Sequence, residues 1–368
     1  MILWPGNGAS NIRLQRTAGS RCSPPAAEAG VIRTGHGRGL SRQGDEVIDR
    51  RLFLASLTMG ALAAPSGAPA DERLRRVGYL EPATSANTLP REILPQRLRE
   101  RGWIEGKNIA FDWLYADAKT ERLSPLVGEL LRRKVDVIVT SGTTAIRAAK
   151  DATTTTPIVM VGGGDPVGSR LVQSLAHPGG NVTGVSLVGQ ELMEKNLELL
   201  KRLLPTLKTV TMIRAANNPA NGFFAQPMDA AARRLGVRLT ILDIHRSDDL
   251  GAAFDRISAD AAIMLLDPMF LAHRRRIAAL AIRRRLPLMT AERRYAEAGF
   301  LLTYGAGFAE VVRLAAAFVD RILRGVKPAD LPVEQPSQLD LVLNLATAKA
   351  LGLSIRPAIL VQARQVID

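Results

Sequence analysis

The stretch Val135–Lys150, VDVIVTSGTTAIRAAK, decides the fold that we predict for this chain. Its first part, Val135–Thr140, is apolar or β-branched around one Asp, which is typical of a strand buried on both faces. The strand pattern ends at Ser141–Thr144, and an Ala-rich helical pattern follows. Such a turn brings unpaired backbone N–H groups to one point, which suits a carboxylate or another anion. Glycine in such a turn also serves plain packing, so both interpretations stand at this point.

A second strand and its loop follow directly. Pro157–Val161 has a strand pattern, and Gly162–Pro166 is its loop. Ligands of open parallel sheets lie outside the carboxyl ends of the strands, so the two loops predict one wall of a small-molecule site. Nucleotide binding is disfavoured, because Val167 stands where the pattern Gly-x-Gly-x-x-Gly needs its last glycine, and the chain has no Gly-x-x-x-x-Gly-Lys-Ser/Thr.

The composition fits a soluble α/β protein of two domains, for which 368 residues suffice. The net charge of +14 is spread over short basic runs without interleaved aromatics. These runs indicate solvated helix faces rather than a nucleic-acid groove. Cys22 is the only cysteine, so the chain forms no intramolecular disulfide. We expect neither a metal nor a cofactor.

The N-terminal segment reads as an export signal preceded by an extension. Residues 1–46 show no sustained periodicity, and we predict them to be unstructured or outside the natural protein, with Val47 as a possible true start. Residues 47–70 hold a paired-arginine start at Asp49–Leu54, a short apolar run and an A-x-A site at Ala68–Ala70. The arginine pattern resembles the twin-arginine motif, and Sec export stays open. We expect cleavage near Ala70 and a periplasmic mature chain.

Strand and helix patterns alternate from Arg76 onward, which predicts a doubly wound parallel sheet. The alternation restarts after a helix over Glu191–Leu204, which predicts a second lobe of similar fold. Before that helix we expect strands Val77–Leu80, Ile109–Tyr115 and Val182–Leu187 and helices Pro90–Arg101, Thr120–Arg133 and Gly168–Leu175. After it we expect strands Thr209–Ile213, Arg238–Ile244, Ala261–Leu266, Pro287–Met289 and Leu301–Tyr304, helices Pro227–Leu235, Leu250–Ile257, Leu271–Arg284, Phe308–Leu323 and Ala346–Leu351, and a strand pair Pro332–Gln335 with Leu339–Leu343.

The loops at the carboxyl ends of these strands supply the candidate ligand-binding residues. In the first half they are Glu81, Ser85, Ser141, Gly142, Thr143, Thr144, Gly164 and Asp165. In the second half they are Asn217, Asn218, Asp267, Pro268, Glu292 and Tyr304. Aromatic side chains that could stack on a ligand are Tyr79, Phe223, Phe224, Phe270 and Tyr304, each of which could equally belong to the core.

An ordered set of short motifs resembles one family. From about Arg75 to Asp368 the chain is similar to ABC-transporter substrate-binding proteins of the tryptophan/tyrosine-binding type, which have the type I periplasmic-binding-protein fold. No single motif is specific, whereas their order is. The motifs are Asp165–Val167, His177–Gly184, Asn218–Asn221, Asp267-Pro268, Asp330–Pro336 and Asn344–Gly352.

The resemblance implies two Rossmann-like doubly wound lobes with a ligand cleft between them. Lobe 1 would comprise residues 71–188 plus about 305–330, and lobe 2 residues 189–304 plus about 331–368. A ligand carboxylate would bind the Ser141–Thr144 turn, and Asp267 would meet the α-ammonium group. Asp165 could do the same, although Asp before Pro is equally a turn residue.

The implied function is that of a periplasmic solute-binding protein, not an enzyme. It would bind an amino acid or related carboxylate and deliver it to an ABC permease in the inner membrane, as a monomer and without nucleic acid. One alternative is a periplasmic sensor that presents its ligand without transport. A second is an enzyme on this fold. The chain argues against it, because it has no Gly-x-Ser-x-Gly motif and its histidines are scattered. A third is a transcription regulator, which would need a helix-turn-helix before the first lobe.

Overall fold

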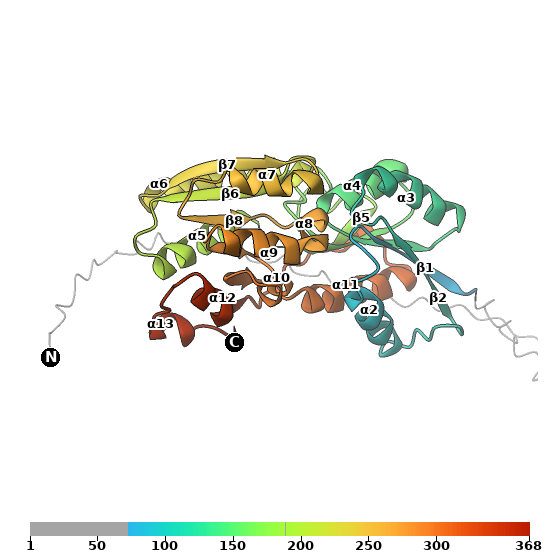
Figure 1. Cartoon of the computed structure of the whole chain (residues 1–368). Coiled ribbons are helices and arrows are strands. Elements are labelled where there is room, and N and C mark those ends of the chain that lie inside the picture. The colour runs from blue at the N-terminus through green and yellow to red at the C-terminus, as the bar shows by residue number, and fades with distance from the viewer. Residues whose placement is uncertain (1–72, 188) are drawn as a thin grey trace, which may run out of the picture. The chain divides into compact units, whose positions relative to one another are not determined.

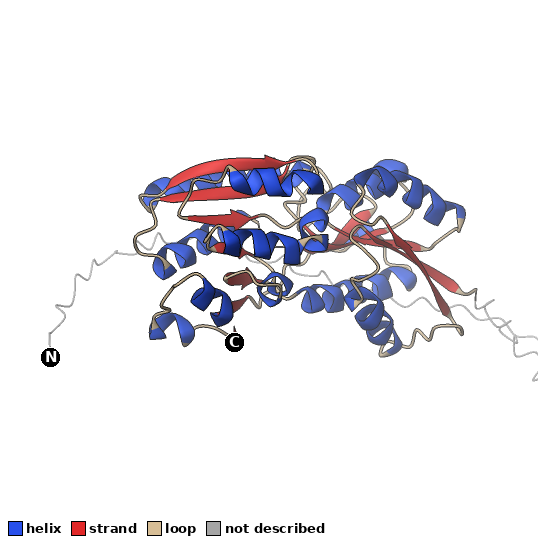
Figure 2. Cartoon of the chain, viewed as in Figure 1, coloured by secondary structure: helices blue, strands red, loops and turns tan. Residues whose placement is uncertain are grey.

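Two sheets carry the architecture of residues 73–187 and 189–368, the part of the chain that the structure, a computed structural model, describes. The predicted export signal and extension lie outside these residues. One sheet has five parallel strands in the order β2-β1-β3-β4-β5, and the other has seven in the order β12-β11-β10-β9-β8-β6-β7. Helices pack on both faces of each sheet (Figure 2), which confirms the prediction of doubly wound α/β lobes.

The first lobe is built on the five-stranded sheet. Its core lies on both faces, one under α2 and α11 and the other under α3 and α4. The strands are β1 (Arg75–Glu81), β2 (Ile109–Tyr115), β3 (Val137–Ser141), β4 (Ile158–Gly163) and β5 (Val182–Ser186), and the helices are α2 (Leu89–Arg99), α3 (Leu123–Arg132), α4 (Thr143–Ala152) and α11 (Phe308–Leu323).

The second lobe is built on the seven-stranded sheet, in which only the β10–β11 pairing is antiparallel. Its strands are β6 (Thr209–Ala215), β7 (Arg238–Ile244), β8 (Ala261–Met264), β9 (Leu288–Thr290), β10 (Leu302–Gly305), β11 (Asp340–Asn344) and β12 (Gln365–Ile367). Its helices are α5 (Gln190–Leu203), α6 (Ala225–Arg234), α7 (Leu250–Asp255), α8 (Pro268–Ala272), α9 (Arg274–Arg283), α10 (Arg293–Glu297), α12 (Leu345–Ala350) and α13 (Pro357–Leu360).

The helix α11 shows how the two lobes share the chain. It follows β10 of the second sheet, yet it packs beside α2 on the first sheet (Figure 1). Its apolar residues recur at helical spacing, so one face is buried from Val311 to Leu323. The chain crosses between the lobes three times: after β5, between β10 and α11, and before β11. The last crossover begins after Glu334, which still bridges to Val185 of β5.

Three predicted elements are wrong in detail. The segment Gly168–Leu175 forms turns rather than a helix, since Arg170 has a positive φ of 53° that a right-handed helix excludes. Pro332–Gln335 forms no strand with Leu339–Leu343; Glu334 bridges to β5 instead, and β11 pairs with β10 and β12. The single helix over Leu271–Arg284 is two helices, α8 and α9, that meet at His273.

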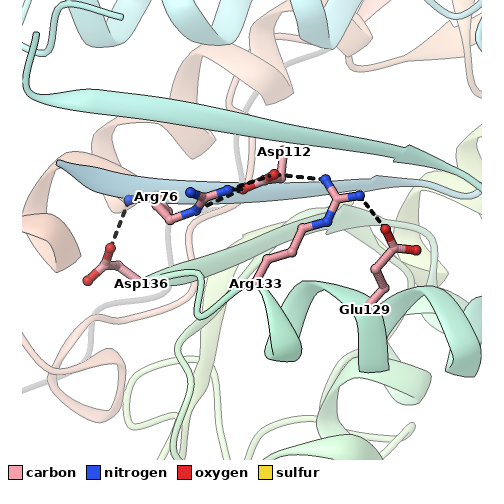
Figure 3. A network of polar contacts seen from close by, with 5 residues as sticks. All are labelled: Arg76, Asp112, Glu129, Arg133 and Asp136. Carbon is pink, nitrogen blue, oxygen red and sulfur yellow. Dashed lines mark hydrogen bonds and ion pairs between the residues drawn. The ribbon is translucent and has the colours of Figure 1, made fainter. Parts of the chain in front are cut away.

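A charged network holds the amino ends of the first three strands together (Figure 3). The Asp112 carboxylate accepts hydrogen bonds from Arg76 Nη2 at 2.8 Å and from Arg133 Nη1 at 2.9 Å. Arg133 also pairs with Glu129, and the Arg76 backbone N–H donates to Asp136 at 2.7 Å. The network lies on the side of the sheet opposite the carboxyl-end loops, so its role is structural.

Asp112→Ala is expected to lower the free energy of unfolding by about 1–2 kcal/mol. The Asp112 side chain is 8% exposed, whereas both arginines are 39% exposed and regain water when their partner is lost. Urea unfolding measures the change. Asp229→Ala is the matched control, because its partner Arg233 is 79% exposed, and it should leave the midpoint where it is. Equal midpoints for both variants would contradict the role of this network.

Candidate functional site

A cavity of about 130 Å³ lies where the carboxyl ends of strands from both sheets face one another. It is close in volume to cavities of about 150 Å³ that admit benzene, so it suits a compact organic molecule. Most of its wall is apolar, as small-molecule sites usually are. The apolar wall includes Val161, Leu187, Leu192, Met193, Phe224, Leu265, Leu266, Leu271, Phe308 and Leu339.

The start of α4 forms one polar part of the wall. The buried strand β3 ends at Ser141, and Gly142 has a φ of 77°, which glycine adopts at little cost. A Cβ on Gly142 would lie 3.2 Å from Pro268 Cγ, so the glycine also allows the close approach of the second lobe. No side chain caps α4, and its first N–H groups lack intrahelical partners. This helix start is therefore suited to an anion.

The Thr143 hydroxyl is already engaged within the first lobe. Its Oγ1 accepts a hydrogen bond from the Gly164 backbone N–H at 3.1 Å, and the side chain is buried. The bond holds the loop after β4 against α4. For the Ser141 hydroxyl, by contrast, the described residues offer no hydrogen-bond partner within the site, and Ser141 is half-buried in the wall.

Three polar residues of the second lobe cap short helices at the cavity. Asn218, Asp267 and Glu292 each accept a hydrogen bond from the backbone N–H two residues later, at 3.1, 2.9 and 3.2 Å. Asn218 Nδ2 also donates to Asp267 Oδ2 at 3.0 Å. Burial raises the pKa of Asp267 above its usual range, although these two donors oppose the shift.

A bridge of polar side chains crosses the cleft. Arg294 Nη1 of the second lobe donates to Asn87 Oδ1 of the first at 2.7 Å, and Arg294 Nε donates to Glu292 at 2.9 Å. The guanidinium also lies 4.2 Å above the ring centroid of Phe308, the first residue of α11. We call Asn87, Arg294 and Glu292 the cross-cleft bridge. It joins the two lobes across the cavity.

Glu81, the last residue of β1, is a buried carboxylate beside this bridge. Its Oε1 accepts from the Ala83 backbone N–H at 2.9 Å, and its Oε2 accepts from Asn87 Nδ2 at 2.7 Å. Burial raises the pKa of the carboxyl to about 7, because the two neutral donors and the nearby charge of Arg294 offset the lost hydration only in part.

The cavity gathers nine of the fourteen residues predicted from the sequence. They are Glu81, Ser141, Gly142, Thr143, Gly164, Asn218, Asp267, Pro268 and Glu292. The other five lie outside its lining: Ser85 and Asn217 are exposed, Thr144 and Tyr304 are half-buried elsewhere, and Asp165 forms a turn in which its carboxylate accepts from the Gly168 N–H at 2.9 Å. Of the aromatics proposed for stacking, Phe224 lines the cavity, whereas Tyr79 and Phe270 are core residues.

Asn87 and Arg294 are the main polar residues that the sequence did not single out. Asn87 lies two residues beyond Ser85, the last candidate residue of the loop after the first strand. Arg294 stands in a pair of arginines, which is typical of a solvated helix end. Phe308 belongs to a helix whose apolar pattern indicates only core. A weak signal for Arg294 was its position two residues after Glu292, at the carboxyl end of a predicted strand.

Two further features are absent from the described residues, a metal-binding cluster and a membrane-spanning helix. Within residues 73–187 and 189–368, no three His, Cys, Asp or Glu side chains are grouped so that they could hold a metal ion. In the same part of the chain, no helix is both long enough and apolar enough to cross a membrane.

Comparison with known proteins finds similar proteins in bacteria. A tyrosine-binding protein of Clostridioides difficile is 25% identical over 258 residues, which cover 70% of this chain and 74% of the relative. A conserved domain protein from Vibrio cholerae has a structure similar to this one with a TM-score of 0.76 and 27% identity, over 80% of this chain and all of that one. A domain from Streptococcus pneumonia in complex with L-Trp gives a TM-score of 0.75 with 23% identity, again over 80% of this chain and all of that one.

The family model described as ABC transporter substrate binding protein matches residues 90–367. This range covers the second lobe and all of the first except β1, the loop after it and Leu89, so that Glu81, Ala83 and Asn87 are the residues of the cavity wall outside it. The fold is the type I periplasmic-binding-protein fold that the sequence predicted. The chain belongs to the family of ABC transporter substrate-binding proteins.

Proposed function

We propose that this protein is an exported solute-binding protein that carries an amino acid or a related small carboxylate to an ABC permease of the inner membrane. The observation that carries the proposal is the cavity, whose wall combines an uncapped helix start, carboxylates and a mostly apolar surface. The tyrosine-binding relative and the L-Trp complex support an amino acid as the ligand. In this proposal the chain acts as a monomer.

The ligand carboxylate binds at the start of α4, next to Ser141 and Gly142. The N–H groups of that turn and the Ser141 hydroxyl supply its hydrogen bonds. The ammonium group faces one of the two wall carboxylates that have no hydrogen-bonded cation, Glu81 in the first lobe or Asp267 in the second. The ligand side chain lies against the apolar wall.

A thermal-shift screen of free amino acids and small organic acids tests this proposal. We expect a raised melting temperature with at least one α-amino acid, because a ligand bound only by the native state stabilises it by mass action. Isothermal titration then gives the dissociation constant. Small-angle scattering should show a smaller radius of gyration with the ligand, since it favours the closed state. A screen without any hit among carboxylates would contradict the proposal.

Export of the protein has its own test. The predicted signal in residues 47–70 should place the protein in the periplasm, with a mature N-terminus near Asp71. Cell fractionation with N-terminal sequencing checks this. A cytoplasmic protein would contradict export while leaving the binding proposal intact.

A further inference from the structure

The charges on the cavity wall do not balance. Arg294 is the one cationic side chain among the residues that line the cavity, and it is already held by Glu292, Asn87 and the Phe308 ring. Glu81 and Asp267 remain as carboxylates that receive only neutral donors. Arg294 acts on Glu81 only through space, without a hydrogen bond to it. A buried carboxylate needs a cationic partner or takes up a proton, so a cationic group of the ligand would be the partner that keeps such a carboxylate charged.

Of the two carboxylates, Glu81 is the one that does not cap a helix. Asp267 is the N-cap of α8, where the helix N–H groups and the helix dipole favour a negative charge, and its side chain is only half-buried. Glu81 is 2% exposed, and the chain after it runs through a loop before α2 begins at Leu89. No helix dipole therefore acts on Glu81. Its pKa of about 7, raised by burial, agrees with this buried position.

We propose that Glu81 is the acceptor for the ammonium group of the ligand, and that the site therefore selects ligands in which a carboxylate and an ammonium group are separated by a short distance. This inference rests on the proposed function. The carboxylate end lies on α4, the ammonium end on β1, and both belong to the first lobe. The ligand head group would then be recognised by one lobe before the second closes over it.

Asn87 is the positioning residue in this arrangement. Its Nδ2 donates to Glu81 and its Oδ1 accepts from Arg294, so one amide joins the ammonium acceptor to the cross-cleft bridge. An amide in this place has a single orientation that satisfies both partners. Recognition of the ammonium group and closure of the lobes are therefore linked through one side chain.

The test uses matched pairs of compounds that differ only in the ammonium group. They are L-tyrosine and 3-(4-hydroxyphenyl)propanoate, L-tryptophan and indole-3-propanoate, and L-leucine and 4-methylpentanoate. The wild-type protein should bind the amino acid of at least one pair about a hundredfold more tightly than its partner, as measured by isothermal titration. Glu81→Gln should remove most of that preference by weakening amino-acid binding alone. Glu81→Asp, which keeps the charge, should retain part of it.

Two further variants separate recognition from structure. Asp267→Asn keeps a good N-cap for α8 and should preserve the preference for the amino acid. Asn87→Ala tests the positioning role: it should weaken both members of a pair, because it breaks the cross-cleft bridge, and it should also reduce the preference for the amino acid, because Glu81 loses the donor that holds it. Thermal unfolding of each variant confirms that it is folded, and a Glu81→Gln protein that does not fold leaves Glu81→Asp and Asp267→Asn to decide.

Three results would overturn the assignment. The first is a Glu81→Gln variant with the wild-type ratio of affinities, and the second is a ratio that collapses in Asp267→Asn. The third is a wild-type protein that binds no ammonium compound of the panel. In this last case the des-amino acids separate the two proposals: their binding leaves the proposed carboxylate site standing, whereas no binding by any compound contradicts the proposed function as well.

Discussion

Ser141→Asp is expected to weaken ligand binding by about a thousandfold or more, which corresponds to about 4 kcal/mol. Ser141 lies in the cavity wall at the start of α4, where we propose that the ligand carboxylate binds. An aspartate there places a second anion beside the first in an enclosed, largely apolar site, where like charges repel strongly. Isothermal titration with the best hit of the screen measures the loss.

Two neighbouring substitutions make this result interpretable. Ser141→Asn has nearly the same shape as Ser141→Asp without its charge, and Ser141→Ala removes only the hydroxyl group. We expect each to cost roughly tenfold in affinity, because the backbone N–H groups of α4 remain. The thermal stability of Ser141→Asp should be retained, since a negative charge near a helix start is favourable. Equal binding by the Asp and Asn variants would mean that no ligand anion sits at this turn.

Gly305→Ala is expected to lower the free energy of unfolding by about 3–5 kcal/mol. A Cβ at this position would lie 1.9 Å from the backbone oxygen of Ala291, so the backbone of β10 or of the loop after β9 would have to move. Gly305 ends β10 directly before the chain crosses to α11, and Ala291 lines the cavity. Denaturant unfolding should therefore show a lower midpoint at an unchanged m-value.

Gly307→Ala is the matched control two residues later. Its φ of −66° is ordinary for any residue, and a Cβ there would meet no atom within 4 Å. Its unfolding midpoint should stay at the wild-type value. If Gly305→Ala were as stable as this control, the close approach of β10 to the Ala291 carbonyl would not exist in the folded protein.

The sequence predicted those parts of the fold that local patterns determine. The strand β3 and the helix α4 follow from a buried apolar run and a helical repeat, and α11 follows from apolar residues at helical spacing. The predicted helix after Pro166 was wrong because Leu171 and Val172 are buried without belonging to a helix or strand. Their apolar character imitates one face of a helix, whereas the positive φ of Arg170 has no signature in an arginine side chain.

The lining of the cavity was predictable where polar residues stand at the ends of strands or just after them. Glu81, Ser141, Asp267 and Glu292 all stand there, and the cavity includes each of them. The cross-cleft bridge could not be predicted, because Asn87 and Arg294 are 207 residues apart and come from different lobes. No local sequence pattern around either residue indicates this contact.

The capping role of the second-lobe residues has a consequence for how the ligand range of this protein could evolve. A substitution of Asn218, Asp267 or Glu292 changes a helix cap as well as the site, and losing such a cap typically costs about 1 kcal/mol. Exchanges among apolar side chains of similar size, such as Leu192, Met193 or Leu265, are the best tolerated changes in a packed wall, and they leave every cap and its hydrogen bonds in place. Mutation is therefore freest at the apolar wall, so descendants of this protein should diverge in the ligand side chain they accept before they diverge in its head group.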